Sequence, residues 1–126
     1  MKLSLIALSA GSLLAISAPA YAHHSFAMFD TSVTKSVTGT VTEFNWTNPH
    51  SSFAVASADA GGVAQTWYFE MNSPQNLVRE GWKRSSIAPG DKVTVSYHPL
   101  RNGKPGGSYV SLVLPTGVTL GGAQVQ

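Results

Sequence analysis

The feature that most constrains this 126-residue chain is a single helix signal set between strand patterns. Ser73 suits an N-cap, Pro74 suits the first helical position, and Gly81 provides a stop. We expect a short helix that turns Leu77 and Val78 inward. Three strand patterns precede this helix and two follow it. That order matches the OB-fold, a five-stranded Greek-key barrel.

The strands are indicated by apolar and polar residues that alternate between turn signals. The first pattern runs from Lys35 to Trp46, and its inward parity changes between Thr42 and Glu43, which predicts a β-bulge. The later strands carry these expected inward residues: Phe53 and Val55, then Trp67, Phe69 and Met71, then Val93, Val95 and Tyr97, then the run from Tyr109 to Leu114. Trp82, directly after the helix, is expected to plug the underside. A seven-stranded sandwich does not fit five strands. The sequence therefore predicts an all-β fold with one short helix, built as a five-stranded OB-fold-like barrel.

Residues 1–22 have the three parts of a secretory signal peptide. Lys2 supplies the positive charge, Leu3 to Ile16 supply the apolar run, and Ala20-Tyr21-Ala22 supplies the cleavage motif. The apolar run is too short for a transmembrane helix. We predict cleavage after Ala22, a periplasmic or secreted location, and no membrane span in the mature chain.

The rest of the chain divides into three parts. Residues 23–34 form a leader whose Phe26, Met28 and Phe29 are costly to leave in water, so the leader should pack on the domain. Residues 35–115 form the barrel, and residues 116–126, rich in small side chains, form a flexible tail. The chain is therefore expected to hold one domain, and its pattern does not indicate an oligomeric state.

Composition excludes several kinds of site and partner. The chain has no cysteine, so disulfides, thiolate metal sites, cysteine nucleophiles and a lipid-anchored N-terminal cysteine are ruled out. Its eight basic residues exceed its six acidic residues by two, and loss of Lys2 with the signal leaves seven against six. Such a balance creates no field for a polyanion, so nucleic acid is not an expected partner.

Four histidines provide the main candidate site: His23, His24, His50 and His98. Cleavage after Ala22 would leave His23 as a terminus with both an α-amine and an imidazole. In an OB-fold, His50 and His98 lie in or beside the two loops that flank the ligand face, and their parity is outward. An amine and neighbouring imidazoles suit Cu(II), Zn(II) or Ni(II), and the set resembles the histidine brace of certain copper proteins. The alternative for each histidine is that it is an ordinary surface residue that binds no metal.

Aromatic and basic side chains form a second candidate site. Trp46, at a strand end, is the tryptophan most expected to be exposed, and Tyr68 has outward parity. Together they could stack a sugar, a base or an apolar ligand. Arg101, in the glycine-rich loop of residues 99–108, could hold an anion. The alternative for the aromatic residues is that they pack in the barrel, and the alternative for Arg101 is that it is an ordinary solvated side chain.

Enzyme signatures are missing from the sequence. No serine lies in a G-x-S-x-G motif, and the six carboxylates are scattered. We expect a binding protein rather than an enzyme, with metal-dependent redox activity left open.

Five short motifs also resemble a known family: His23-His24-Ser25-Phe26, Trp46-Thr47-Asn48-Pro49-His50, Gly81-Trp82, Pro89-Gly90-Asp91 and Arg101-Asn102-Gly103-Lys104. They are similar to small exported bacterial proteins grouped as domain of unknown function 6152. The resemblance implies export and a small β-barrel, and it implies no activity.

Two main functions remain open from the sequence. The first is an exported periplasmic barrel that binds a transition metal, copper foremost, through His23, His50 and His98, with His24 as a substitute ligand. The alternative is a non-metal ligand- or protein-binding module of the cell envelope that uses Trp46, Tyr68 and Arg101. A subunit of an envelope complex without a ligand of its own is a weaker third hypothesis.

Overall fold

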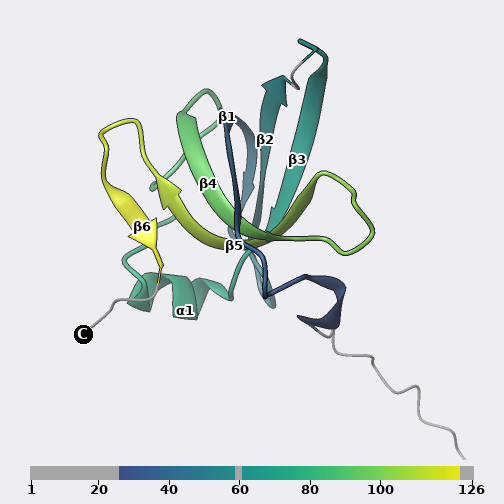
Figure 1. Cartoon of the computed structure of the whole chain (residues 1–126). Helices are drawn as coiled ribbons and strands as arrows, with labels where there is room; N and C mark the ends of the chain where they lie inside the picture. The colour runs from purple at the N-terminus through teal and green to yellow at the C-terminus, as the bar shows by residue number, and fades with distance from the viewer. Residues whose placement is uncertain (1–25, 59–60, 123–126) are drawn as a thin grey trace, which may run out of the picture.

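The computed structural model describes residues 26–58 and 61–122. The predicted signal peptide and the ligand candidates His23 and His24 therefore lie outside the described residues. The elements, in chain order, are η1 (Phe26–Met28), β1 (Lys35–Asn45), β2 (Ser52–Ala58), β3 (Ala64–Glu70), α1 (Pro74–Arg79), β4 (Lys92–Pro99), β5 (Gly106–Val113) and β6 (Thr119–Gly121) (Figure 1).

The strands form one sheet that closes on itself. Its order is β3-β2-β1-β4-β5-β6, and an additional parallel pairing between β3 and β5 closes the first five strands into a barrel. The remaining pairings are antiparallel. The predicted five-stranded OB-fold-like barrel with one short helix is therefore confirmed.

The long first strand bends at the predicted bulge. Val41 pairs with Val55 and Glu43 pairs with Ala54, so Thr42 is the extra residue on β1. A bulge of this kind increases local twist, which lets β1 pair with β4 at its start and with β2 at its end.

Barrel closure depends on a glycine that the sequence analysis placed in a loop. β5 begins at Gly106, three residues before the predicted start at Tyr109. Gly106 has a φ of 134°, and a Cβ there would collide with the Tyr68 carbonyl group. Only the absent side chain lets β5 approach β3 this closely, so the predicted loop of residues 99–108 is shortened from its end.

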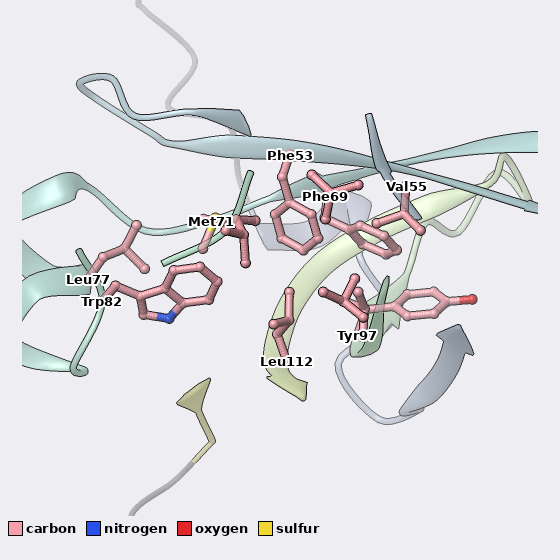
Figure 2. Close-up of a cluster of buried hydrophobic side chains, with 12 residues drawn as sticks. Phe53, Val55, Phe69, Met71, Leu77, Trp82, Tyr97 and Leu112 are labelled. Atoms are coloured by element: carbon pink, nitrogen blue, oxygen red, sulfur yellow. The ribbon is translucent and has the colours of Figure 1, made fainter. Parts of the chain in front are cut away.

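The barrel interior is filled by aromatic and branched side chains (Figure 2). The Phe53 and Phe69 rings lie 5.0 Å apart, and Phe69 lies 5.1 Å from Tyr97. Trp82 is 1% exposed beneath this cluster, which confirms its predicted plugging role. The buried cluster consists of Val41, Phe53, Val55, Phe69, Met71, Leu77, Trp82, Ile87, Val93, Val95, Tyr97 and Leu112.

Helix α1 begins as predicted but turns only one of its two apolar residues inward. The Ser73 hydroxyl accepts a hydrogen bond from the Asn76 amide, and Pro74 begins the helix. Leu77 is fully buried, whereas Val78 is 59% exposed. The inward prediction for Val78 was wrong because adjacent positions on so short a helix point about 100° apart. Within residues 26–58 and 61–122, no helix has the length and apolar character needed to cross a membrane.

The tail predicted as flexible contains a strand. β6 pairs with β5, matching Leu120 to Leu112, and the Tyr109 hydroxyl donates a 2.9 Å hydrogen bond to the Leu120 carbonyl. The sequence patterns had not indicated a strand in residues 116–126, so β6 is an element that they missed. A partly buried tyrosine hydroxyl needs an acceptor, and this strand supplies it.

Candidate functional site

The described part of the leader is fastened to the connection between β4 and β5. Phe29, 5% exposed, forms an antiparallel bridge with Leu100. The Asp30 amide donates to the Pro99 carbonyl at 2.8 Å, and the Arg101 amide donates to the Met28 carbonyl at 2.9 Å. The chain segment just after η1 is thus held against the barrel by both backbone pairing and side-chain burial.

Arg101 strengthens this attachment. Its Nε donates to the Ala27 carbonyl at 3.0 Å, and its guanidinium lies 3.8 Å from Asp30 Oδ1. A hydrogen bond from the Ser32 hydroxyl to Asp30, aided by the Arg101 charge, lowers the pKa of the Asp30 carboxyl. Arg101 is therefore a leader contact, and its guanidinium is already engaged with the chain.

His50 follows the Asn48-Pro49 turn and lies at the end of β3. Its Nδ1 is 3.2 Å from the Met71 carbonyl oxygen and 3.7 Å from Glu70 Oε1. A carbonyl oxygen can only accept, so Nδ1 is the donor in this contact, and in a neutral ring the Nε2 lone pair is left for another partner. The His50 side chain is 43% exposed, so this nitrogen belongs to an accessible ring.

His98 has the same kind of anchor in a different place. Its Nδ1 is 2.8 Å from the Val33 carbonyl oxygen of the leader. Across the sheet His98 pairs with Ser108, and Ser108 pairs with Glu70. With adjacent strands about 4.8 Å apart, the backbones of His98 and Glu70 are separated by roughly 10 Å.

Two depressions lie beside these residues. The first, here called the His50 pocket, has a volume of about 280 Å³ and is lined by His50, Glu70, Glu80, Phe29 and Gly122, among others. The second, here called the β1–β3 groove, has a volume of about 370 Å³. Its lining includes Met28, Glu43, Ala54, Tyr68, Glu70 and Leu100. Glu70 and Phe29 border both depressions.

The predicted metal ligands are only partly brought together. Of the four histidines, the structure describes His50 and His98, and their rings are fixed to different carbonyl groups. Among the described residues, no group of three histidine or carboxylate side chains is arranged to hold a metal ion. His50 and Glu70 form a neighbouring pair, with His50 Nδ1 3.7 Å from Glu70 Oε1.

The second predicted set is also divided. Trp46 is half-buried and packs edge-on against Phe44, with ring centroids 5.9 Å apart. Arg101 contacts the leader instead. Tyr68 alone of the three lines the β1–β3 groove, where it is 61% exposed.

Sequence reasoning missed the residues that join the two depressions. Glu70 alternates with the buried Phe69, so its outward position was readable from strand parity. Phe29 was expected to pack, but its contact with Leu100, 71 positions away in the chain, has no local signal.

The closed barrel and the short helix between β3 and β4 define a small OB-like β-barrel domain. The chain belongs to the family of unknown function DUF6152, whose model matches residues 10–109. No curated protein matches the chain, and no solved structure matches it.

Proposed function

We propose that this chain is an exported small β-barrel protein, periplasmic or secreted, that binds a transition metal ion, copper foremost. The proposed ligands are His50 and the α-amine and imidazole of His23, freed by cleavage after Ala22. His24 is the substitute ligand. Three nitrogen donors favour Cu(II), which binds such sites more tightly than the other divalent first-row ions.

The observation that carries the proposal is the anchored ring of His50. Its Nδ1 faces the Met71 carbonyl, and Glu70 lies beside it. Ligating histidines commonly donate their second ring nitrogen to a carbonyl or carboxylate, which fixes the tautomer and aims the free nitrogen at the metal. His50 already has this arrangement.

Chain length supports the participation of His23. Phe29 borders the His50 pocket, and η1 begins at Phe26. Three residue steps separate Phe26 from His23, and an extended chain covers about 11 Å in that number of steps. A processed terminus would therefore start a short distance from the chain segment that lines the pocket.

His98 is left outside the proposed ligand set and supplies the matched control. It has the same carbonyl-anchored ring as His50 but lies on the far side of Ser108 from Glu70. Its loss should remove a surface imidazole without removing a ligand.

The test is a Cu(II) titration of the tag-free protein that begins at His23, followed by calorimetry and by thermal unfolding. We expect one equivalent to bind and to raise the Tm, because a ligand selective for the folded state stabilises it. His50→Ala and acetylation of the terminus should each weaken binding by about tenfold or more. His98→Ala should leave the Kd within about threefold. Unchanged binding after both the His50 substitution and the acetylation would refute the proposal.

Export has its own test. Mass spectrometry of the protein recovered from a periplasmic fraction should give the mass of a chain that starts at His23. Recovery only as an intact chain in the cytosolic fraction would contradict export.

A further inference from the structure

The β1–β3 groove is a trough with small residues along its floor. Glu43, Ala54 and Tyr68 are register partners across β1, β2 and β3. Ala54 is only 2% exposed although it alternates with the inward residues Phe53 and Val55. The longer side chains on either side of Ala54 therefore rise above it and form the walls.

The groove combines apolar surface with negative charge. Tyr68 is 61% exposed and Met28 is 42% exposed, so a large apolar area faces outward. Glu43 and Glu70 line the same groove, and its lining contains no lysine, arginine or histidine. The nearby Arg101 guanidinium is engaged by Asp30 and the Ala27 carbonyl. The groove is thus complementary to apolar groups that carry positive charge.

The β3 edge next to the groove suits an extended chain. β5 pairs with β3 only at Tyr68, Phe69 and Glu70. In the described ranges, residues 64–67 have a strand partner on the β2 side alone. Figure 1 shows the β2–β3 hairpin projecting beyond the rest of the barrel. A one-sided strand of this kind can accept another strand through main-chain hydrogen bonds.

We propose that the β1–β3 groove and the adjoining edge of β3 bind an extended basic segment of a partner protein. Lysine or arginine side chains of that segment pair with Glu43 and Glu70, and an apolar side chain lies over Ala54 against Tyr68. Charge-assisted hydrogen bonds to the carboxylates and cation–π attraction at the tyrosine ring favour this chemistry. The interaction needs no metal ion, and it shares Glu70 with the His50 pocket.

The probe is a blocked hexapeptide of alternating lysine and leucine, compared with its glutamate and leucine counterpart, both with a metal chelator present. NMR amide shifts should change along residues 64–70 with the basic peptide only. Tyr68→Ala and the double variant Glu43→Gln with Glu70→Gln should each weaken binding by about tenfold, equivalent to roughly 1.4 kcal/mol. Because Tyr68 is exposed and both glutamate changes conserve shape, these variants should keep the barrel fold. If one variant fails to fold, the other still decides.

Matched controls lie elsewhere on the barrel. Val118→Ala removes an apolar side chain that is 54% exposed in the segment between β5 and β6. Glu80→Gln removes a carboxylate that lines the His50 pocket. Both should leave the peptide affinity within about twofold. Equal binding of the acidic peptide, equal losses in the controls, or shifts confined to other strands would overturn the proposal. A dimer in sedimentation that Tyr68→Ala dissociates would also overturn it, because the groove would then hold a second copy of this chain.

Discussion

The aromatic residues at the closed end of the barrel and on its outer face have opposite surroundings. Trp82 is 1% exposed, its Nε1 donates to the Tyr109 hydroxyl at 2.9 Å, and that hydroxyl donates onward to the Leu120 carbonyl. Tyr68 stands 61% exposed beside Ala54 on the outer face. The first group is joined to three elements and therefore stabilises the fold. Because most of the Tyr68 side chain faces outward, we expect it to influence folding little.

The largest expected effect is at the closed end. Trp82→Ala should lower the free energy of unfolding by about 3–5 kcal/mol, since it empties a site packed against Phe44 and Tyr109 and removes the hydrogen bond that Trp82 Nε1 donates to the Tyr109 hydroxyl. Urea denaturation followed by circular dichroism measures this loss. A loss below about 1 kcal/mol would show that neighbouring side chains fill the space left by Trp82. The stability effects of Trp82→Ala and Tyr68→Ala would then no longer differ.

The second effect tests the close approach of β5 to β3, where Gly106 pairs with Tyr68. Gly106→Ala should cost about 3 kcal/mol, because the new Cβ collides with the Tyr68 carbonyl group and the φ of 134° disfavours a side chain. Gly103→Ala is the matched control, with a φ of 76° and open space around the Cβ, and should cost about 1 kcal/mol. Denaturant unfolding of both variants gives the difference. Equal costs would mean that the backbone conformation alone matters and that the close approach of β3 and β5 does not.

The third effect appears at alkaline pH and distinguishes the contribution of the buried Tyr109 hydroxyl to stability from that of the Tyr109 ring. Burial, with a smaller contribution from the Glu80 charge, raises the pKa of Tyr109 well above its usual value of 10.0, although the Trp82 hydrogen bond opposes the shift. A group whose pKa is raised by folding contributes stability that is complete below the unfolded pKa and is lost as the pH rises past it. Stability should therefore fall above about pH 10.

Tyr109→Phe should cost about 1–2 kcal/mol near neutral pH through the lost hydrogen bonds, and should flatten this alkaline fall. Tyr97, whose pKa is also raised by burial, leaves part of the slope in place. Unfolding free energies measured between pH 8 and 11 give both quantities. Parallel curves for the two proteins would contradict the assignment to Tyr109.

The smallest effect is the counterpart on the outer face. Tyr68→Ala should change the free energy of unfolding by less than about 0.5 kcal/mol, as expected for an exposed side chain away from caps and cavities. The same urea experiment measures it. A cost near that of Trp82→Ala would show that Tyr68 holds the sheet together and would undermine its proposed role in binding.

The parts of the fold that local patterns determine were predictable from sequence. Strand alternation, the parity change at Thr42 and the Ser73-Pro74 start all act within a few residues, and each appears in the structure. Trp82 was placed correctly because a large apolar side chain directly after a short helix has one sheltered position available, beneath the barrel.

The parts that depend on distant pairing were not predictable in the same way. Gly106 matters because it meets Tyr68, and β6 exists because Leu120 pairs with Leu112, relations that no local parity reveals. Trp46 was expected to be exposed, yet its ring packs against Phe44 and is half-buried.

The candidate site shows the same division. The outward directions of His50 and His98 followed from strand parity, but the carbonyl groups that orient their rings belong to other segments of the chain. The groove was foreseen only through Tyr68, because its lining comes from four strands, the leader and the β4–β5 connection. The sequence predicted the properties of single residues, but it did not predict which residues from distant segments lie together.

The position of Gly122 bears on how this protein should be produced for study. Gly122 follows β6, donates its amide to the Val110 carbonyl at 2.9 Å, and borders the pocket that contains His50. A polyhistidine purification handle fused close behind it would bring foreign imidazoles to the mouth of that pocket, and one fused at the front would block the amine of a processed His23. Affinity purification therefore calls for a histidine-free handle joined through a long spacer and removed by protease before any metal is added.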